Sequence, residues 1–452
     1  MSEGLDLKAL EAKANQVVEM AMARGADTAY VVTNWQRSQK VAVRGGEVEQ
    51  LSEAESVGVE LLVSRDQRRA TVESCDLNTP SLQAMVDQAL DLTRYTDQDT
   101  YYTLPDAARL VDDVEDLDLV DPTIDSLDTP SRIELARQLE SLMLAQDARL
   151  KSNGAGVNSA RLRSALANSH GFSQSEEETL IRYQTSGFAK DTVNSDDLNS
   201  GRNQSGGRGS TARHRQDLMT PEEVSKEAAH QILRKIGARK PKTGNFPVYF
   251  EPRIARSLWE QLINAMKGTA IFRSKSYLKD RVNTKVAVPE LTIQDVPRLP
   301  RCLGSRCFDN EGVACYTTDL VRGGMLQTYL LSTYSANKLD LATTGHAGGV
   351  SNLMIAPGTM DESEMLKAMG TGLWVTTLLG SGTNLSSGDY SHGALGLWVE
   401  NGEVAYPVME FTINSNLDEM FQNIACIGSN VDKSSSIQTP GIVIGKMSIS
   451  GT

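Results

Sequence analysis

The stretch LGLWVENGEVAYPV (395–408) decides how the second half of the chain folds. Two apolar runs, 395–399 and 404–408, lie on either side of the dipeptide Asn401-Gly402. A two-residue type I′ turn needs positive φ at both central positions, which Asn and Gly adopt most readily. The pattern therefore predicts a β-hairpin of two half-buried strands.

The rest of the second half carries the same kind of signal. RGGM (322–325) predicts another hairpin, and turn residues separate short apolar runs from residue 219 onward. Thr220-Pro221-Glu222-Glu223 has the cap, proline and early acids of a helix start. We therefore expect residues 219–452 to form a strand-rich, barrel-like α+β domain.

The first half alternates helical and strand patterns. Apolar residues recur at helical spacing from Leu10 to Met22, and Gly25 ends that pattern. Three strands are predicted at 30–32, 41–43 and 57–63, with RGGE (44–47) as a turn between the last two. Two further helices are expected to begin at Thr79-Pro80 and Thr129-Pro130, with Thr as the cap, and residues 151–190 are expected to be strand-rich. Residues 1–218 thus resemble an α/β domain with helices packed on a sheet, and the whole chain is α+β.

Two polar segments interrupt these patterns. Residues 97–128 hold eleven acidic residues and one basic residue, Arg109, which predicts a solvated surface connector or, alternatively, a docking strip for a basic partner. Residues 191–216 are rich in Asn, Ser, Gly and Arg and predict a flexible loop. An RNA-binding tract is the alternative there, but the segment has no aromatic residue to stack on bases.

Composition excludes several classes of protein. The 452 residues carry a formal net charge of −13, which argues against general nucleic-acid binding. No apolar run approaches the roughly 20 residues of a transmembrane helix, and the N-terminus lacks a secretory signal, so no membrane association is expected. Five scattered cysteines do not form a disulfide framework. A reducing, cytoplasmic setting is expected.

Familiar catalytic motifs are missing from the sequence. No two of the five histidines lie one helical turn apart, so there is no HExxH helix. Cys302, Cys307 and Cys315 lack the spacing of zinc-binding pairs, and we expect them to be structural. A metal site assembled from distant segments would leave no such motif.

Two glycine-rich segments combine flexible backbone with polar side chains. In TGHAGG (344–349) the glycines predict a close backbone approach or positive φ, which are common where a chain passes a ligand. The alternative is a structural turn with a hydrogen-bonded histidine. SGDYSHGALG (387–396) places donors and acceptors beside glycines, although adjacent Ser391 and His392 should point to opposite faces of a strand. The candidate site residues are Gly345, His346, Gly348, Gly349, Gly388, Asp389 and Tyr390.

These segments also carry a family resemblance. The sequence resembles the TldD/TldE (PmbA) family, and its TldE/PmbA branch in particular, over nearly its whole length. The motifs are GGEVEQLSEAESVGVELLV (45–63), FDNEGVACYTTDLVRGGMLQTYLLSTYSANKL (308–339), TTGHAGG (343–349), MGTGLWVTTLLGSGTN (369–384) and GDYSHGALGLWVENGEVAYPV (388–408).

The resemblance implies a function and a partner. Members of this family form a cytoplasmic, heterodimeric metalloprotease that degrades or trims unfolded peptides. The TldD-like subunit binds zinc through an HExxxH helix and a C-terminal cysteine, and the TldE-like subunit has the same fold without the metal site. The resemblance thus implies a TldD-like partner, unfolded peptide substrates and zinc held by that partner. Without the partner, the chain could form a homodimer.

Two missing features make this chain similar to the metal-free, TldE-like subunit. The segment that would carry HExxxH reads RIARSLWEQLINA (253–265), and the C-terminal segment 434–452 has no cysteine. We therefore expect no catalytic residue and no metal ligand in this chain.

The role of the glycine-rich segments in such a subunit is a hypothesis. They could let a substrate strand approach, with His346, Asp389 and Tyr390 lining a chamber that faces the partner's zinc. Two alternatives stay open: a peptide-binding or chaperone-like protein without proteolysis, and an independent hydrolase that uses the region from Asp389 to His392.

Overall fold

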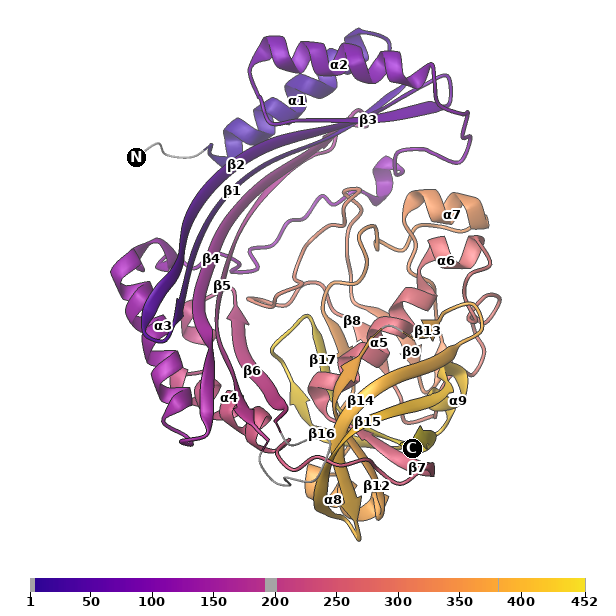
Figure 1. Cartoon of the computed structure of the whole chain (residues 1–452). Helices are drawn as coiled ribbons and strands as arrows, with labels where there is room; N and C mark the ends of the chain where they lie inside the picture. The colour runs from indigo at the N-terminus through magenta and orange to yellow at the C-terminus, as the bar shows by residue number, and fades with distance from the viewer. Residues whose placement is uncertain (1–4, 192–200, 381, 452) are drawn as a thin grey trace.

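The computed structural model describes residues 5–191, 201–380 and 382–451. Two β-sheets follow one another along these residues, one of six strands and one of eleven. Figure 1 shows the six-stranded sheet as a long arch that curves beside the second, strand-rich part of the chain. The α+β class predicted from the sequence is confirmed.

The first sheet is built from long antiparallel strands. In spatial order they are β3 (Arg68–Ser74), β2 (Glu47–Arg65), β1 (Thr28–Arg44), β4 (Leu150–Asn168), β5 (Ser173–Lys190) and β6 (Asn203–Ala212). Two of the expected strands, 30–32 and 41–43, are parts of the single strand β1. The polar residues between them remain extended because their backbone pairs with β2 on one side and β4 on the other, whatever their side chains are.

Four helices pack on this sheet. They are α1 (Leu7–Ala23), α2 (Thr79–Thr93), α3 (Thr129–Leu144) and α4 (Pro221–Leu233), with α1 and α2 at one end and α3 and α4 at the other (Figure 1). Helix α4 begins just after the expected boundary at residue 218 and packs on β5 and β6. The division of the chain at 218 itself remains a prediction.

The helix starts were predicted almost correctly. Thr220 caps α4 through a capping box with Glu223, as expected. The caps of α2 and α3 lie one residue earlier than predicted, at Asn78 and Asp128, whose side chains accept from the backbone N–H three residues on. Asn and Asp are at least as good as Thr in this position, so the preceding residue takes the cap.

The second sheet is formed by strands of 2 to 14 residues. They are β7 (Gly244–Phe250), β8 (Ile293–Asp295), β9 (Thr318–Arg322), β10 (Met325–Leu326), β11 (Leu353–Ile355), β12 (Gly372–Leu379), β13 (Thr383–Asn384), β14 (Asp389–Glu400), β15 (Glu403–Asn416), β16 (Ile424–Asp432) and β17 (Ile437–Ser450). Its helices are α5 (Pro252–Met266), α6 (Gly268–Phe272), α7 (Thr333–Leu339), α8 (Glu362–Met369) and α9 (Leu417–Gln422).

Part of this sheet closes into a barrel. Strand β7 pairs with β12 on one side and with β17 on the other. The sequence of pairings β12–β14, β14–β15 and β15–β17 completes the ring. The barrel-like architecture expected from the sequence is therefore confirmed.

Both predicted hairpins of the second half are present. Asn401 and Gly402 have φ of 53° and 81° between β14 and β15, and Gly323 and Gly324 have φ of 56° and 74° between β9 and β10. These positive values are those of the turn that the dipeptides predicted.

The prediction that residues 191–216 form a flexible loop is wrong for most of the residues there that the structure describes. Residues 203–212 form β6, which pairs with β5 along its whole length, and 215–217 form a short 3₁₀ helix. Small residues such as Gly207 allow β6 to approach β5, because a Cβ at Gly207 would lie 2.8 Å from the Ser186 Cβ. Residues 192–200 of the predicted loop lie outside the described residues.

The acidic segment 97–128 is more than a solvated connector. Its backbone pairs with the second part of the chain through Val111 N–H to the Gly312 carbonyl, at 3.0 Å. Glu115 pairs with Arg298 at 2.6 Å, and the buried Leu117 packs near Cys307 and Phe308. Apolar residues between the acids thus anchor the segment, and some of the acids pair within the chain itself.

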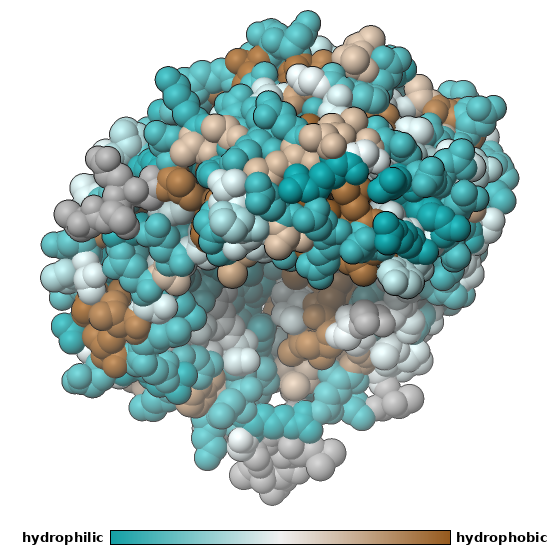
Figure 2. Space-filling model, turned by 90° about the horizontal axis from the view of Figure 1, so that it is seen from above, coloured by the Kyte–Doolittle hydropathy of each residue, from teal (hydrophilic) through white to brown (hydrophobic). Residues whose placement is uncertain are grey.

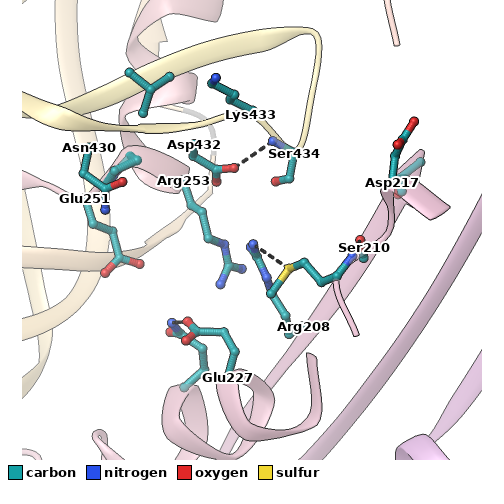
Figure 3. Close-up of a pocket in the computed structure, with 15 residues that line it drawn as sticks. Arg208, Ser210, Asp217, Glu227, Glu251, Arg253, Asn430, Asp432, Lys433 and Ser434 are labelled. Atoms are coloured by element: carbon teal, nitrogen blue, oxygen red, sulfur yellow. Dashed lines mark hydrogen bonds between the residues drawn. The ribbon is translucent and has the colours of Figure 1, made fainter. Parts of the chain in front are cut away.

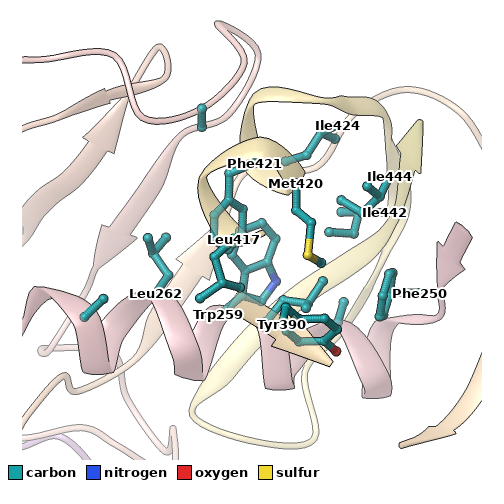
Figure 4. Packing of buried hydrophobic residues seen from close by; sticks show 14 of the residues in the cluster. Phe250, Trp259, Leu262, Tyr390, Leu417, Met420, Phe421, Ile424, Ile442 and Ile444 are labelled. Carbon is teal, nitrogen blue, oxygen red and sulfur yellow. The ribbon is translucent and has the colours of Figure 1, made fainter. Parts of the chain in front are cut away.

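The largest hydrophobic core lies between α5 and the barrel strands. Figure 4 shows Trp259 and Leu262 of α5 beside Phe421 and Leu417 of α9, with Ile442 of β17 nearby. Trp259 is fully buried, stacks on Phe421 at 5.6 Å between ring centroids, and donates from Nε1 to Thr439 Oγ1 at 2.6 Å. This core fixes α5 against the barrel.

Barrel closure depends on close backbone approach at Gly396. A Cβ there would collide with the Trp374 carbonyl oxygen of β12, a backbone atom that cannot easily move. We expect Gly396→Ala to lower the free energy of unfolding by about 1–3 kcal/mol. Gly393→Ala is the control on the same strand, since its Cβ would meet the Leu379 side chain at 3.3 Å and would lie at an ordinary 3.7 Å from the nearest backbone oxygen. Guanidinium unfolding curves should separate the two variants, and an equal loss would contradict this account.

Candidate functional site

Helix α5 lies at the position where a TldD-like subunit is expected to carry its HExxxH helix. It follows β7 directly, and its inward residues are apolar: Ala255, Leu258, Trp259, Leu262, Ile263, Ala265 and Met266. Glu260 lies on the exposed side, and the helix contains no histidine. Imidazole and thiolate are the donors that zinc prefers, so the residues of α5 do not fit zinc. Within the described ranges, no three His, Cys, Asp or Glu side chains form a group that could hold a metal.

The loop 344–349 has a dense set of internal contacts. His346 is buried, with its Nδ1 2.9 Å from Thr344 Oγ1 and its Nε2 3.2 Å from the buried Asp295 carboxylate. The next residue, Ala347, donates its N–H to Asp309 at 2.9 Å. These contacts match the alternative of a structural turn with a bonded histidine.

The glycines of this loop have the expected backbone conformation. Gly345, Gly348 and Gly349 have φ of 71°, 91° and 101°. A Cβ at Gly345 would lie 2.9 Å from the Ala314 carbonyl oxygen, and one at Gly348 would lie 2.7 Å from the Asn310 side chain. At these two positions, the close approach is to other parts of the same chain.

The second segment lies at the start of β14. Gly388 has φ of 82°, and the exposed Asp389 accepts a hydrogen bond from Ser387 Oγ at 2.6 Å. Tyr390 points into the core, as Figure 4 shows, and its buried hydroxyl has no hydrogen-bond partner among the described residues. Burial raises the pKa of this hydroxyl above its usual value.

Ser391 and His392 do point to opposite faces. Ser391 is exposed and donates to Asn414 Oδ1 at 2.6 Å. His392 is buried, 4.4 Å from the Tyr390 ring between centroids, with its Nε2 3.0 Å from Thr383 Oγ1. The two side chains therefore do not form a nucleophile and base, which removes the geometric ground for an independent Ser–His hydrolase.

The two glycine-rich segments contact different neighbours. Loop 344–349 bonds to the β8 and 309–314 region, whereas residues 388–390 pair with β13 and β15. Strand β14 is also paired on both sides, with β12 and β13 on one and β15 on the other. A substrate strand therefore has no free backbone edge there. The role of these residues in a chamber remains a prediction.

The cysteines of the second part are reduced. Cys307 and Cys315 are buried free thiols, and Cys315 Sγ lies 3.2 Å from the Gly345 carbonyl oxygen. Burial is the main cause that raises the pKa of Cys315 to about 12, so it stays a neutral thiol. This environment is that of a structural residue.

The structure reveals a groove that the sequence did not predict. Three adjoining cavities lie on the six-stranded sheet. One of about 400 Å³ lies between β5 and residues 114–120 and 306–308, and one of about 360 Å³ lies between strands β1, β2, β4 and β5 and residues 306–310. The third, of about 390 Å³, lies along β1, β4 and β5. We call them together the sheet groove. Glu176 of β5 lines all three. In the view from above, the molecular surface is hollowed near its centre (Figure 2).

Glu176 is the central charge of the sheet groove. Surrounding protein, and then the neighbouring Glu178, raise the pKa of its carboxyl group. Glu176 accepts a hydrogen bond from the Ser164 hydroxyl at 3.4 Å, whereas Glu178 pairs with Arg213 at 2.7 Å. The Glu176 carboxylate can thus accept hydrogen bonds from a chain that enters the groove. No sequence motif marks it, because its neighbours come from separate strands and from residues 306–310.

An arched antiparallel sheet beside a closed five-strand barrel defines the structural class of this chain. The family models describe the same class: domain 1 of the PmbA/TldA metallopeptidases matches residues 31–93, the central domain matches 122–236 and the C-terminal domain matches 243–451. The chain is 35% identical to Metalloprotease PmbA of Escherichia coli O157:H7, over 98% of this chain and 96% of that one. The chain belongs to the PmbA/TldD metallopeptidase family, in its PmbA/TldE branch.

Solved structures share the fold. A candidate modulator of DNA gyrase from Bacteroides thetaiotaomicron aligns with a TM-score of 0.92 and 26% identity, over 98% of this chain and 99% of that one. TldE from Thermococcus kodakarensis aligns with a TM-score of 0.84 and 17% identity, over 97% and 100% of the two chains. Among the described residues, no helix is both long and apolar enough to cross a membrane.

The Tyr390 hydroxyl has a measurable consequence for stability. Because it is buried without a partner, Tyr390→Phe should raise the free energy of unfolding by about 1 kcal/mol. Tyr249→Phe is the matched control: that buried hydroxyl donates to Glu362 at 2.9 Å, so its loss should cost about 1 kcal/mol or more. Urea unfolding of both variants checks the pair. A loss of stability in Tyr390→Phe would show that its hydroxyl has a partner.

His392 should make stability depend on pH. Burial lowers its pKa below the usual 6.5 in the folded chain, so the unfolded chain binds the proton more readily. The stability contributed by neutral His392 is therefore present above pH 6.5 and is lost as pH falls through the lowered folded pKa. Urea unfolding between pH 7.5 and 5 should show a smaller loss for His392→Gln than for the wild type. Parallel losses would contradict the expectation.

Proposed function

We propose that this chain is the non-catalytic subunit of a two-subunit cytoplasmic zinc metalloprotease that degrades or trims unfolded peptides. In this proposal a related partner with an HExxxH helix holds the zinc. This chain completes the complex and helps to hold the substrate. Family membership supports the metallopeptidase part of the proposal, and the residues of α5 support the assignment of the zinc to a partner.

The composition of α5 is the observation that carries the proposal. A zinc-hydrolase helix presents two histidines toward the metal and a glutamate toward the bound water. In α5 the inward positions are filled by the core residues Leu258, Trp259 and Leu262, and the exposed Glu260 has no histidine within the helix to act with. The helix therefore contributes packing in this chain, and the hydrolytic chemistry is assigned to the partner.

The sheet groove gives this subunit a way to hold substrate. An unfolded peptide offers backbone N–H and C=O groups at every residue, and the groove presents polar acceptors and apolar surface side by side. Glu176 accepts from such a peptide, while Phe308 and Leu166 contact its apolar side chains. This use of the groove differs from strand addition at β14, whose edges are already paired.

The proposal predicts activity only in the mixed complex. An unstructured, fluorescence-quenched peptide is incubated with this chain, with an HExxxH-bearing partner, and with both together. Cleavage should occur only in the mixture and should stop when a chelator removes the metal. Size-exclusion chromatography of each sample reports whether the two chains assemble, and whether this chain alone forms a homodimer.

Two variants sharpen this experiment. Replacing the glutamate of the partner's HExxxH by Gln should abolish cleavage without preventing assembly, whereas Glu260→Gln in this chain should leave cleavage unchanged. Chelator-sensitive cleavage by this chain alone would overturn the proposal. Peptide binding by this chain without cleavage in any sample would favour the alternative of a chaperone-like binding protein.

A further inference from the structure

A second cavity lies where the two parts of the chain meet. It has a volume of about 480 Å³ and is lined by β6, the middle and end of α4, the first residues of α5 and the end of β16 (Figure 3). We call it the junction cavity. It shares no residue with the sheet groove. Its walls are mostly charged or polar. Which of these charges lack a partner within the chain indicates what kind of ligand the cavity could bind.

Each carboxylate of the junction cavity already has a donor. Glu251 receives two hydrogen bonds from Arg234, both at 3.0 Å, and one from Trp374 Nε1 at 2.9 Å. Asp432 pairs with Arg256 and accepts from the Ser434 N–H at 2.8 Å.

The remaining two carboxylates have weaker but definite partners. Glu227 accepts from Gln231 Nε2 at 2.6 Å, and Asp217 lies 3.7 Å from Arg301. The acids of the cavity are therefore engaged by groups of this chain.

The cations of the junction cavity are not engaged in the same way. Arg208 of β6 and Arg253 of α5 form no ion pair within 4.0 Å among the described residues. Arg208 donates only to the Met219 sulfur, at 3.5 Å, and its Nε is buried without a partner. Arg253 Nη1 is likewise buried without a partner. The exposed Lys433 adds a third positive charge at the rim.

The two guanidinium groups face each other. Figure 3 shows the side chains of Arg208 and Arg253 reaching into the cavity from opposite walls, with their charged ends together. Burial, and next the charge of Arg208, lowers the pKa of Arg253, and this shift is opposed only in part by carboxylates beyond ion-pair distance, those of Glu251, Glu227 and Asp432. Like charges brought together away from water are unfavourable unless an anion lies between them. Arg is the side chain whose planar fork matches the paired oxygens of phosphate and carboxylate groups.

We propose that the junction cavity binds the phosphate or carboxylate group of a small organic ligand between Arg208 and Arg253. The volume lies in the usual range of small-molecule sites, so the cavity can take an organic group together with the oxyanion. Hydroxyl and amide donors of Ser210, Thr211 and Asn430 line the same space. Such a ligand joins the six-stranded sheet to α5 and β16, and this role does not depend on the proposed function.

Anion titrations of the full chain test the proposal. Isothermal titration calorimetry with inorganic phosphate and with citrate, at constant ionic strength and with chloride as the reference, measures binding directly. We expect saturable binding of at least one of the two anions. Binding should weaken at least tenfold in Arg208→Gln and in Arg253→Gln, and it should not change in Arg149→Gln, which removes an exposed arginine paired with Asp147. Preference for phosphate or for citrate assigns the ligand class.

Folding of the variants is checked by circular dichroism, and Arg253→Lys keeps the charge if Arg253→Gln does not fold. The lysine variant should fold and should bind the anion more weakly than the wild type, because it has lost the paired donors. Absence of saturable binding, or equal binding by the wild type and both arginine variants, would overturn the proposal and leave a water-filled cavity.

Discussion

The pairing of β7 with β17 is the constraint on which the second half of the molecule depends. It sets Phe250 beside Ile442 and Val248 beside Ile444, and so closes the barrel with the first and last strands of that half. Helix α5 leaves β7 directly and is fixed against β17 by the Trp259 to Thr439 hydrogen bond. The junction cavity follows from the same geometry, because the residues before α5 come to lie beside the end of β16.

Signals between neighbouring residues were enough to predict most helices and turns. They did not predict which distant strands pair with each other. Asn401-Gly402 determines its own turn, and Thr220 with Glu223 determines its own helix start, so neighbouring residues contain the information. Strand β6 was missed because its glycines and polar residues carry little apolar signal, yet β5 supplies a complete row of backbone partners. The sequence predicted a barrel-like sheet but not which strands close it, since no residue near 247 specifies that its strand pairs with residues 442–449.

The candidate site shows the same limit. The sequence correctly indicated positive φ at Gly345 and opposite orientations for Ser391 and His392. It did not predict Asp295 as the partner of His346, because the two residues lie in separate segments that only the fold brings together. Glu176 and Arg253 carry no motif at all. Their significance depends on cavities whose walls come from distant parts of the chain.

Closure by the first and last strands also affects how the chain is made. The six-stranded sheet consists mainly of successive strands, and most of it can form while the second half is still being synthesised. The barrel has no such early route, because β7 waits for β17, which follows every other strand of the second sheet along the chain. Until then the apolar face of α5, with Trp259 and Leu262, has no β17 to cover it. The period of greatest aggregation risk therefore lies between the synthesis of α5 and that of β17, when a chaperone that shields this helix would matter most.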